Sequence, residues 1–321
     1  MTAPLASTAG TISGRTALVG VLGDPVRHSL SPAMHNAALQ QLGLDWVYLA
    51  LPTPAASLAP VLEGLEALGC RGLNVTIPHK QAVAALCREL SPLAQRLGAV
   101  NTLVPHRQGG WFGTNTDVEG FLAPLREPAN PGPAAASWAE QRALVLGCGG
   151  SARAVVAALV ELGLGQITLV GRRASSLAAF ETACRGWAPQ LVTMAWPDQD
   201  DGHRDGHRQE LVEALGAAQL VVNTTPLGMA AAGDRLASSL SPLGPGELEA
   251  LAPGGCVYDL IYTPRPTALL RQAAARGCRA IDGLEMLVRQ GAAALGLWSG
   301  VQELPVAAMR AAALEQLQRR P

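Results

Sequence analysis

The feature that most constrains the fold is a regular alternation of short apolar strands and helices in the second half of the chain. From residue 143 onward, predicted strands and helices follow one another in the order Ala143–Leu146, Ala152–Leu162, Gln166–Val170, Ser175–Cys184, Leu191–Ala195, Leu220–Thr224, Cys256–Ile261 and Thr267–Ala275. Because helices connect the successive strands, the strands are expected to run parallel. The pattern therefore predicts a doubly wound parallel sheet of the Rossmann type, with helices on both faces.

The first 126 residues also alternate strands and helices, and they predict a separate α/β domain. Ser31 and Pro32 are expected at the N-cap and the first position of a helix, because serine accepts hydrogen bonds from free amides and proline fits a first turn. The other predicted segments are a helix that starts at Lys80 or Gln81, a helix at Val118–Leu125, and the strands Thr16–Leu22, Asp45–Leu51, Gly72–Ile77, Ala99–Pro105 and Trp111–Thr116.

Length and composition indicate two domains. A chain of 321 residues exceeds the size that one core usually serves, and residues 127–140 concentrate proline, alanine and glycine without periodicity. Near the C-terminus, the alanine-rich helical segments Gly283–Trp298 and Pro305–Arg319 suit close packing and are predicted to return to the first domain. The expected parts are a flexible start at 1–15, a first domain composed of 16–126 and about 287–321, and a second domain at 127–286.

Charge and cysteine content exclude several classes of protein. Hydrophobic residues make up 49% of the chain and charged residues 15%, which excludes a disordered chain. The formal net charge of −1 provides no positive field for a nucleic-acid backbone, so no nucleic-acid partner is expected. The six cysteines form no zinc-type cluster, and the polar segment 198–208, with His203 and His207, is interpreted as a solvated loop, so no metal is expected. Without a signal peptide or an apolar span, we expect no membrane partner and a cytoplasmic monomer or homodimer.

Lys80 stands out because it is the only lysine among the 24 lysine and arginine residues. A lysine amine can be tuned to exchange its proton near neutral pH, whereas arginine in a protein stays charged. Composition alone favours a coding bias that left one lysine. Whether Lys80 has a chemical role or is a remnant of coding bias therefore has to be judged from the residues around it.

A glycine-rich turn follows the strand Ala143–Leu146 and opens the next helix. It has the form G-x-G-x-x-A, and the residues expected beside a dinucleotide are Gly147, Cys148, Gly149, Gly150, Ser151 and Ala152. Glycines let the backbone approach a pyrophosphate, and free amides at a helix N-terminus bind its charge. An NAD site would show an acidic residue on the next strand, but that strand ends in Arg172 and Arg173, whose guanidiniums fit a 2′-phosphate. The sequence therefore favours NADP(H).

Polar side chains also gather at predicted strand ends in the first domain. Thr76 lies near the end of one predicted strand and Lys80 follows it, Asn101 lies in another strand, and Asn115 and Asp117 lie at the end of a third. Ligands of open α/β sheets bind beyond the carboxyl ends of the strands, so these residues predict a small-molecule pocket. Each residue has a structural alternative, and Asp117 in particular could be the N-cap of the helix that follows it.

Eight short motifs, taken together, resemble the shikimate dehydrogenase family and occur in order over nearly the whole chain. They are His28-Ser29-Leu30-Ser31-Pro32, Asn74-x-Thr76-x-Pro78-x-Lys80, Gly98-Ala99-Val100-Asn101-Thr102, Asn115-Thr116-Asp117, Gly147-x-Gly149-Gly150-x-Ala152-Arg153, Asn223-Thr224-Thr225-Pro226-x-Gly228-Met229, Tyr258-Asp259-x-x-Tyr262 and Asp282-Gly283-x-x-Met286-Leu287-x-x-Gln290. So many ordered matches are far more specific than the glycine turn alone. The resemblance implies reversible, NADPH-dependent reduction of 3-dehydroshikimate to shikimate, a step towards chorismate and the aromatic amino acids.

The resemblance also implies roles for individual residues. Lys80 and Asp117 match the catalytic pair. Arg172 matches the arginine of an Asn-Arg-Thr strand end, from which Gly171 and Arg173 depart, and Ser176 stands where a basic residue is often found. The residues that match substrate contacts are Ser29, Ser31, Thr76, Asn101, Asp117, Tyr262 and Gln290, and those expected along the nicotinamide are Thr224, Leu260 and Gly283.

Two other functions compete with this interpretation. A quinate/shikimate dehydrogenase of the same fold that uses NAD(H) would be expected to have an acidic residue near Arg172, where this chain has none. A non-catalytic NADP(H)-binding sensor could lose Lys80 or Asp117 and keep the glycine turn, but this chain has both. The sequence therefore favours an NADP-linked enzyme with a small-molecule substrate.

Overall fold

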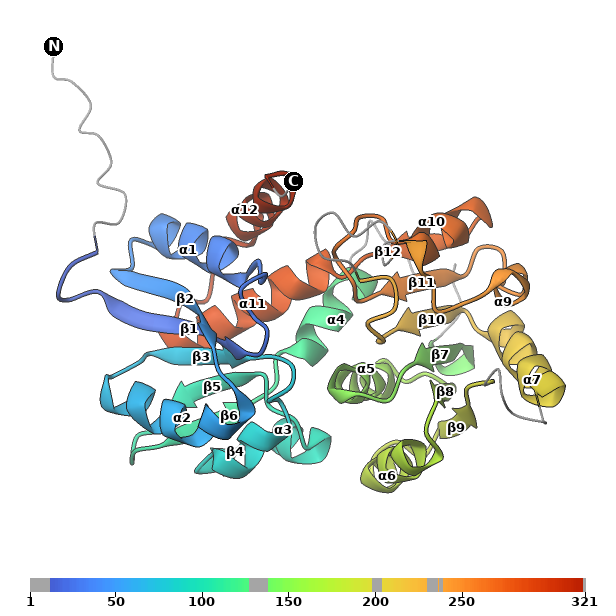
Figure 1. Ribbon diagram of the computed structural model, residues 1–321, viewed down its shortest axis with the longest axis horizontal. Coiled ribbons are helices and arrows are strands. Elements are labelled where there is room, and N and C mark those ends of the chain that lie inside the picture. Colours follow the sequence, from blue (N-terminus) through green and yellow to red (C-terminus); the bar gives the residue numbers. More distant parts are fainter. Residues whose placement is uncertain (1–11, 127–137, 198–203, 230–235, 237–238, 320–321) are drawn as a thin grey trace, which may run out of the picture. The chain divides into compact units, whose positions relative to one another are not determined.

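The chain forms two compact α/β units, which confirms the predicted fold class (Figure 1). The structure is a computed structural model that describes residues 12–126, 138–197, 204–229, 236 and 239–319. Unit 1 contains the chain up to Ser91 together with Val100–Thr114 and Gly291–Arg319, and unit 2 contains Pro92–Ala99 and Asn115–Gln290.

Unit 1 contains a mixed six-stranded sheet. Its strands are β1 (Ala17–Gly23), β2 (Trp46–Pro52), β3 (Gly72–Val75), β4 (Glu89–Leu90), β5 (Thr102–Pro105) and β6 (Trp111–Thr114), in the spatial order β2-β1-β3-β5-β6-β4. β1 runs parallel to β2 and β3, whereas β5 is antiparallel to both of its neighbours. Its helical segments are α1 (Ser31–Leu42), α2 (Leu58–Ala67), the end of α11 (Leu284–Ser299), α12 (Val306–Gln318) and the 3₁₀ turns η1 (Ala55–Ser57) and η2 (Ala82–Leu86).

The C-terminal helices return to unit 1, as predicted. α12 packs against α1. Near the end of α11, Trp298 Nε1 donates a hydrogen bond to Leu103 O in β5 at 3.0 Å. The indole lies on Gly72, where a Cβ would overlap the ring, so glycine at this position lets β3 accept Trp298.

Unit 2 contains six parallel strands. They are β7 (Arg142–Leu146), β8 (Gln166–Gly171), β9 (Leu191–Ala195), β10 (Leu220–Asn223), β11 (Cys256–Asp259) and β12 (Arg279–Ile281), in the spatial order β12-β11-β10-β7-β8-β9. The chain fills one side of the sheet from β7 and then the other side from β10, which places the switch point between these two strands. The helical segments are α3 (Pro92–Leu97), α4 (Asp117–Arg126), α5 (Gly150–Glu161), α6 (Ala174–Cys184), α7 (Arg204–Ala217), α9 (Pro245–Glu249), α10 (Ala268–Ala275), the start of α11 and the 3₁₀ turn η3 (Trp138–Glu140).

Two apolar clusters cover the two faces of the sheet in unit 2. Val145 of β7 belongs to the cluster that includes Phe121 of α4 and Phe180 of α6. Its neighbour Leu144 belongs to the cluster that includes Leu211 of α7 and Leu269 of α10. Successive strand residues point to opposite faces, so helices bury both sides and the predicted doubly wound sheet is confirmed.

The division between the units differs from the predicted ranges 16–126 and 127–286, because α3 and α4 belong to unit 2. Phe121 of α4 is fully buried and stacks on Tyr258 of β11, with ring centroids 4.8 Å apart. Residues 287–290 also belong to unit 2 rather than to the first domain. The predicted boundary came from the proline-, alanine- and glycine-rich composition of residues 127–140. The unit to which α4 belongs depends instead on the sheet against which its apolar side chains are buried.

Two predicted helix starts differ from the structure. The N-cap of α1 is Leu30 rather than Ser31, and Ser29 Oγ accepts a hydrogen bond from Ser31 N at 3.1 Å. The helix predicted at Lys80 is a turn followed by η2, in which only Val83 is buried. A segment with so little apolar surface cannot offset the cost of ordering a longer helix.

The polar segment predicted as a loop is in part helical. α7 begins at Arg204, and Leu211 and Leu215 lie one turn apart in the apolar cluster on the sheet. Their burial stabilises the helix despite its polar start. Residues 198–203 of this segment, 1–11 of the predicted flexible start and 127–137 of the predicted domain boundary lie outside the described residues.

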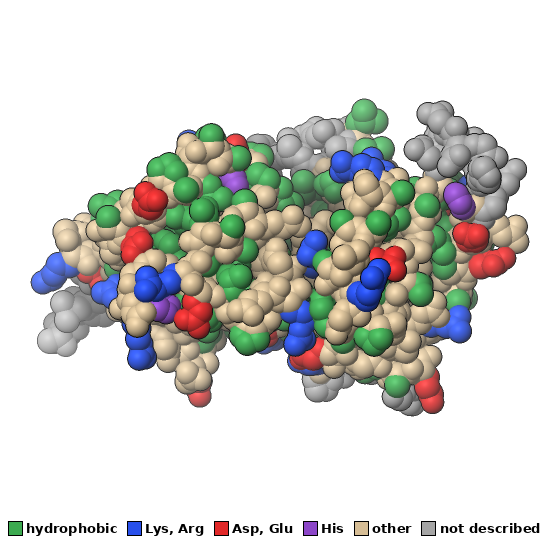
Figure 2. Space-filling model, turned by 90° about the horizontal axis from the view of Figure 1, so that it is seen from below, with side chains coloured by type: hydrophobic (Ala, Val, Ile, Leu, Met, Phe, Trp, Pro, Cys, Tyr) green, Lys and Arg blue, Asp and Glu red, His purple; other side chains and the backbone are tan. Residues whose placement is uncertain are grey.

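Among the described residues, no helix has the length and apolar character needed to cross a membrane. The same residues contain no group of three or more His, Cys, Asp or Glu side chains that could hold a metal ion. On the face that Figure 2 shows, basic and acidic side chains are interspersed rather than gathered by sign.

His35 of α1 is a buried histidine without a hydrogen-bond partner. It is 0% exposed, and neither ring nitrogen has a partner among the described residues. Its ring stacks on Tyr48 with centroids 4.1 Å apart. Burial lowers the pKa of His35 from 6.5 to about 3, so the imidazole stays neutral in the folded protein.

We predict that His35 makes the folded protein less stable in mild acid. Below pH 6.5 the unfolded chain binds a proton at this histidine that the folded protein does not bind, so the free energy of unfolding falls as the pH falls. Relative to His35→Leu, wild type should lose about 1–2 kcal/mol between pH 6.5 and pH 5. Urea unfolding of both proteins at the two pH values measures this, and an equal stability difference at both would contradict the prediction.

Candidate functional site

In unit 1, predicted substrate residues lie where β1 and β3 end and where α1 begins. Thr76 follows β3, and its backbone N donates a hydrogen bond to Leu22 O in β1 at 2.9 Å. Its side chain lies against Gly23, where a Cβ would come within 2.5 Å of Thr76 Cγ2. At the start of α1, the hydrogen bond from Ser31 N to Ser29 Oγ holds these two predicted substrate residues together.

A buried hydrogen-bond network, absent from the sequence prediction, connects these strand ends. Tyr48 OH donates to Asn74 Oδ1 at 2.8 Å, and Asn74 Nδ2 donates to Asn101 O at 3.3 Å. Thr102 Oγ1 donates to Asn101 Oδ1 at 2.9 Å. Burial raises the pKa of Tyr48 well above 10, partly offset by a hydrogen bond with the Ser31 side chain. Tyr48 therefore connects Ser31 to Asn74 of β3, and Asn74 in turn connects to Asn101. The only signal for this network in the sequence was a tyrosine in an apolar strand.

The backbone of Lys80 is held in the turn between β3 and η2. Its carbonyl oxygen accepts a hydrogen bond from Val100 N at 2.7 Å, one residue before Asn101. The preceding His79 is buried, and its Nε2 hydrogen-bonds to Thr53 O at 2.6 Å. These contacts fix the backbone position of Lys80. They also place the Lys80 backbone beside Val100, the neighbour of the predicted substrate residue Asn101.

In unit 2, Asp117 is the first residue of α4 and is 5% exposed. Asn115 Oδ1 accepts a hydrogen bond from Asp117 N at 2.9 Å, and Asn115 Nδ2 donates to Ala99 O at 3.1 Å. Gln290 of α11 packs closely on Gly120 of α4, where a Cβ would lie 2.8 Å from Gln290 Cβ. The structure thus places Gln290 of α11 against the first turn of α4, the helix that begins with Asp117.

The glycine turn lies between β7 and α5, at the switch point of the sheet. Gly147 has φ +102°, and a Cβ there would lie 2.7 Å from Thr224 Oγ1, so the turn touches a predicted nicotinamide residue. No atom lies within 4 Å of the Cβ positions of Gly149 and Gly150. Gly149 is the N-cap of α5 and offers no side chain to its free amides. Open backbone and uncapped amides fit a pyrophosphate.

The remaining residues of the turn have different surroundings. Ala152 is fully buried and packs in the core, whereas Cys148 and Ser151 are half-buried. Arg172 and Arg173 follow β8 and are both exposed. Their guanidiniums are thus available at the strand end where a 2′-phosphate is expected, and the site fits NADP(H).

Leu260, Tyr262 and Gly283 lie near the ends of β11 and β12. Leu260 N donates a hydrogen bond to Asn223 O at 3.1 Å, which ties the end of β11 to β10. At Gly283 a Cβ would overlap Leu260 O, so glycine permits this close approach of two backbone segments. Tyr262 is half-buried in the loop after β11. The structure therefore brings the predicted nicotinamide residues to neighbouring strand ends.

Asp259 is a buried carboxylate for which the sequence motifs predicted no individual role. It accepts hydrogen bonds from Asn223 Nδ2 at 2.9 Å, Ile261 N at 3.1 Å and Thr267 Oγ1 at 2.7 Å. Burial raises the pKa of Asp259 to about 6, and these hydrogen bonds lower it in part. An acidic residue inside the apolar strand Cys256–Ile261 was the available signal.

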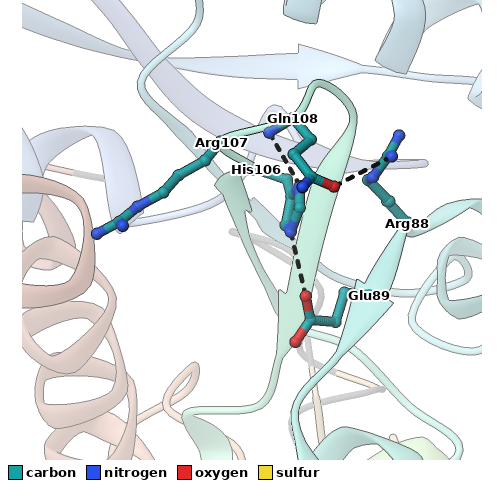
Figure 3. A pocket seen from close by; sticks show the side chains of 5 residues that line it. All are labelled: Arg88, Glu89, His106, Arg107 and Gln108. Atoms are coloured by element: carbon teal, nitrogen blue, oxygen red, sulfur yellow. Dashed lines mark hydrogen bonds and ion pairs between the residues drawn. The ribbon is translucent and has the colours of Figure 1, made fainter.

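A surface pocket of about 350 Å³ in unit 1 contains none of the predicted site residues. It is lined by Arg88, Glu89, His106, Arg107 and Gln108 (Figure 3). His106 Nε2 lies 3.1 Å from Glu89 Oε2, and Arg107 points away from this pair in the close-up. The mixed charges and the exposure of four of the five residues are typical of solvated surface.

Two glycine substitutions should separate the fold of the turn from its ligand binding. Gly147→Ala should lower the melting temperature, because the positive φ and the contact with Thr224 cost about 1–3 kcal/mol. Gly149→Ala meets open space, so it should leave the melting temperature unchanged and weaken dinucleotide binding. Thermal unfolding and titration with NADP measure the two effects. Equal melting temperatures for the two variants would contradict the assigned geometry.

Comparisons with known proteins cover both units. The family model described as the shikimate dehydrogenase substrate binding domain matches residues 21–103, and that of the shikimate 5'-dehydrogenase C-terminal domain matches residues 283–314. A shikimate dehydrogenase (NADP(+)) from Synechococcus sp. (strain JA-2-3B'a(2-13)) is 47% identical over 308 residues, which cover 96% of this chain and 98% of that protein.

Solved structures show the same similarity. Shikimate 5-dehydrogenase from Thermus thermophilus, in complex with NADP(H) and shikimate, has a TM-score of 0.77 and 36% identity and covers 94% of this chain and 100% of that one. Quinate dehydrogenase from Corynebacterium glutamicum, in complex with NAD, has a TM-score of 0.78 and 31% identity, with 94% and 99% covered. Because the sequence similarity extends over nearly the whole length of both chains, this protein belongs to the shikimate dehydrogenase family.

Proposed function

We propose that this protein catalyses the reversible, NADPH-dependent reduction of 3-dehydroshikimate to shikimate, in the pathway towards chorismate and the aromatic amino acids. The observation that carries the proposal is the open glycine turn between β7 and α5 together with Arg172 and Arg173 at the end of β8. An NAD-binding chain would have an acidic residue at that strand end. Nearly full-length similarity to NADP-linked shikimate dehydrogenases supports the same conclusion.

Unit 1 supplies most of the proposed substrate site. The hydroxyls of Ser29 and Ser31 bind the substrate carboxylate, since small donors near a helix start suit an anion. Thr76 and Asn101 hydrogen-bond to the ring hydroxyls. Tyr262 and Gln290, which match substrate contacts of the family, contribute the further contacts of the proposed site. Neutral hydrogen-bond donors and acceptors of this kind can orient a ring that carries several hydroxyl groups.

Unit 2 supplies the proposed NADP(H) site. The backbone from Gly147 to Ala152 holds the pyrophosphate, Arg172 and Arg173 hold the 2′-phosphate, and Thr224, Leu260 and Gly283 line the nicotinamide end. NADP(H), when bound, supplies or accepts the hydride at the substrate carbon that carries the C3 oxygen. The protein is left with the proton on that oxygen.

Lys80 handles this proton in the proposed mechanism. Its ammonium donates a hydrogen bond to the C3 oxygen and releases a proton to it as negative charge develops during reduction. Asp117 accepts a hydrogen bond from the ammonium and orients it. In the reverse direction the Lys80 amine takes the proton from the hydroxyl of shikimate.

The similarity to an NAD-bound quinate dehydrogenase makes quinate oxidation with NAD(H) the second candidate. A non-catalytic NADP-binding sensor is the third, because it needs only unit 2. We further propose a cytoplasmic monomer or homodimer without nucleic-acid or membrane partners, which a net charge of −1 supports.

Initial rates with shikimate and with quinate, each with NADP and with NAD, distinguish the candidates. We expect the highest kcat/KM for shikimate with NADP, and a loss of about 10²–10⁴-fold in kcat for Lys80→Ala. Lys80→Arg keeps the positive charge but cannot exchange a proton, so it should remain as inactive as Lys80→Ala. Preference for quinate with NAD would favour the second candidate, and tight NADP binding without turnover would favour the sensor.

Cofactor choice should depend on the arginines after β8. Arg172→Ser should weaken NADP binding by about 10–100-fold, because one charge-assisted contact is lost, and should leave NAD binding nearly unchanged. Arg185→Ser is the matched control, since Arg185 is an exposed arginine at the other end of α6. Titration of each protein with both dinucleotides measures the effect. An equal loss for NADP and NAD would show that Arg172 does not bind the 2′-phosphate.

A further inference from the structure

Arg153 lies in the first turn of α5, directly after the glycine turn, yet its side chain contacts the end of another helix, α3. Its Nη1 donates a hydrogen bond to Leu97 O, at the C-terminal end of α3, at 3.0 Å. The guanidinium carbon lies 5.6 Å from the centroid of the Phe180 ring. A cation that binds a helix C-terminal carbonyl is well placed electrostatically, and the aromatic ring holds it there.

The backbone beyond α3 is shaped around this arginine. Gly98 has φ +58°, and a Cβ at that position would lie 3.2 Å from Arg153 Nη1. Arg153 Nε is buried and has no hydrogen-bond partner among the described residues. A side chain with one buried nitrogen unsatisfied is oriented by its contact with Leu97 and Phe180 rather than by solvent.

Two hydrogen bonds continue from this segment to Asp117. Ala99, two residues after Leu97, accepts from Asn115 Nδ2 at 3.1 Å. Asn115 Oδ1 in turn accepts from Asp117 N at 2.9 Å. These four residues, Leu97, Ala99, Asn115 and Asp117, all belong to unit 2 and are all buried.

We propose that Arg153 is a positioning residue for Asp117: by holding the end of α3 it fixes the Ala99 carbonyl, which anchors Asn115, which in turn fixes the first residue of α4. This inference rests on the proposed function, in which Asp117 orients Lys80. A basic residue beside a glycine turn would otherwise be assigned to the pyrophosphate. The hydrogen bond to Leu97 O directs the Arg153 side chain to the end of α3 instead.

The test is Arg153→Met, which keeps an apolar stem and removes the hydrogen bond. We expect kcat for shikimate to fall about tenfold or more, while the Kd for NADP changes less than about threefold. In an Asp117→Asn background the same substitution should cause less than about a threefold further loss, because residues that act through one another are not additive. Arg126→Met is the matched control, since Arg126 is an exposed arginine of unit 2 paired with Glu161 at 2.8 Å, and it should keep wild-type kcat.

Hydrogen–deuterium exchange provides a readout that does not depend on turnover. In Arg153→Met the amides at the start of α4 should exchange faster than in wild type, whereas those of α10 should not change. Unchanged exchange at α4 would overturn the proposal, even if the wild-type protein turned over no shikimate. An inactive wild-type protein with faster exchange at α4 in the variant would instead count against the proposed function alone.

Two kinetic outcomes would also overturn the inference. A rise in the Kd for NADP as large as the fall in kcat would show that Arg153 binds the dinucleotide. An equal loss of kcat in the wild-type and Asp117→Asn backgrounds would show that Arg153 does not act through Asp117. If Arg153→Met fails to fold, Asn115→Ala removes the same connection from its other end, and wild-type kcat in that variant would refute the proposal.

Discussion

The hydrogen bonds to the buried Asp259 carboxylate are the interactions on which the ligand-facing end of unit 2 depends. Asp259 ends β11 and is 0% exposed. It binds Asn223 at the end of β10, the backbone of the loop after β11, and Thr267 at the start of α10. Leaving these three donors without their acceptor would cost each its desolvation penalty. One side chain therefore holds together the segments that carry Thr224, Leu260 and Tyr262.

Neutral hydrogen bonds have the corresponding position in unit 1. Tyr48 and Asn74 are both buried, and their 2.8 Å hydrogen bond joins β2 to β3 across β1, the strand that lies between them. Because Asn74 also bonds to Asn101 O, the start of β5 is fixed relative to the end of β3. A fully satisfied buried network specifies one arrangement of the strands, whereas apolar packing alone tolerates several. Ser31 and Asn101, to which the proposed function assigns the substrate carboxylate and the ring hydroxyls, are thereby held in a fixed arrangement.

Local patterns predicted the order of the strands and helices well, because strand–helix alternation and the glycine turn are contained within a few consecutive residues. The buried networks could not be predicted in this way. Tyr48 and Asn74 are separated by 26 residues, and Asn223 and Asp259 by 36. The placement of α4 in unit 2 depends in the same way on the distant partner Tyr258. The candidate site residues came from their resemblance to a family, and the structure adds the contacts that hold them.

Gly171 shows how the surroundings of a departure from the family pattern explain it. A Cβ at this position would lie 2.8 Å from Leu177 Cδ2 and 3.1 Å from Cys148 Sγ, so a larger side chain would require these two side chains to move. Because Cys148 belongs to the glycine turn, the size of the side chain at position 171 is restricted by its contact with that turn. In the proposed function, recognition of the 2′-phosphate then falls to the exposed pair Arg172 and Arg173, and the second arginine would compensate for Ser176, which stands where the family often has a basic residue.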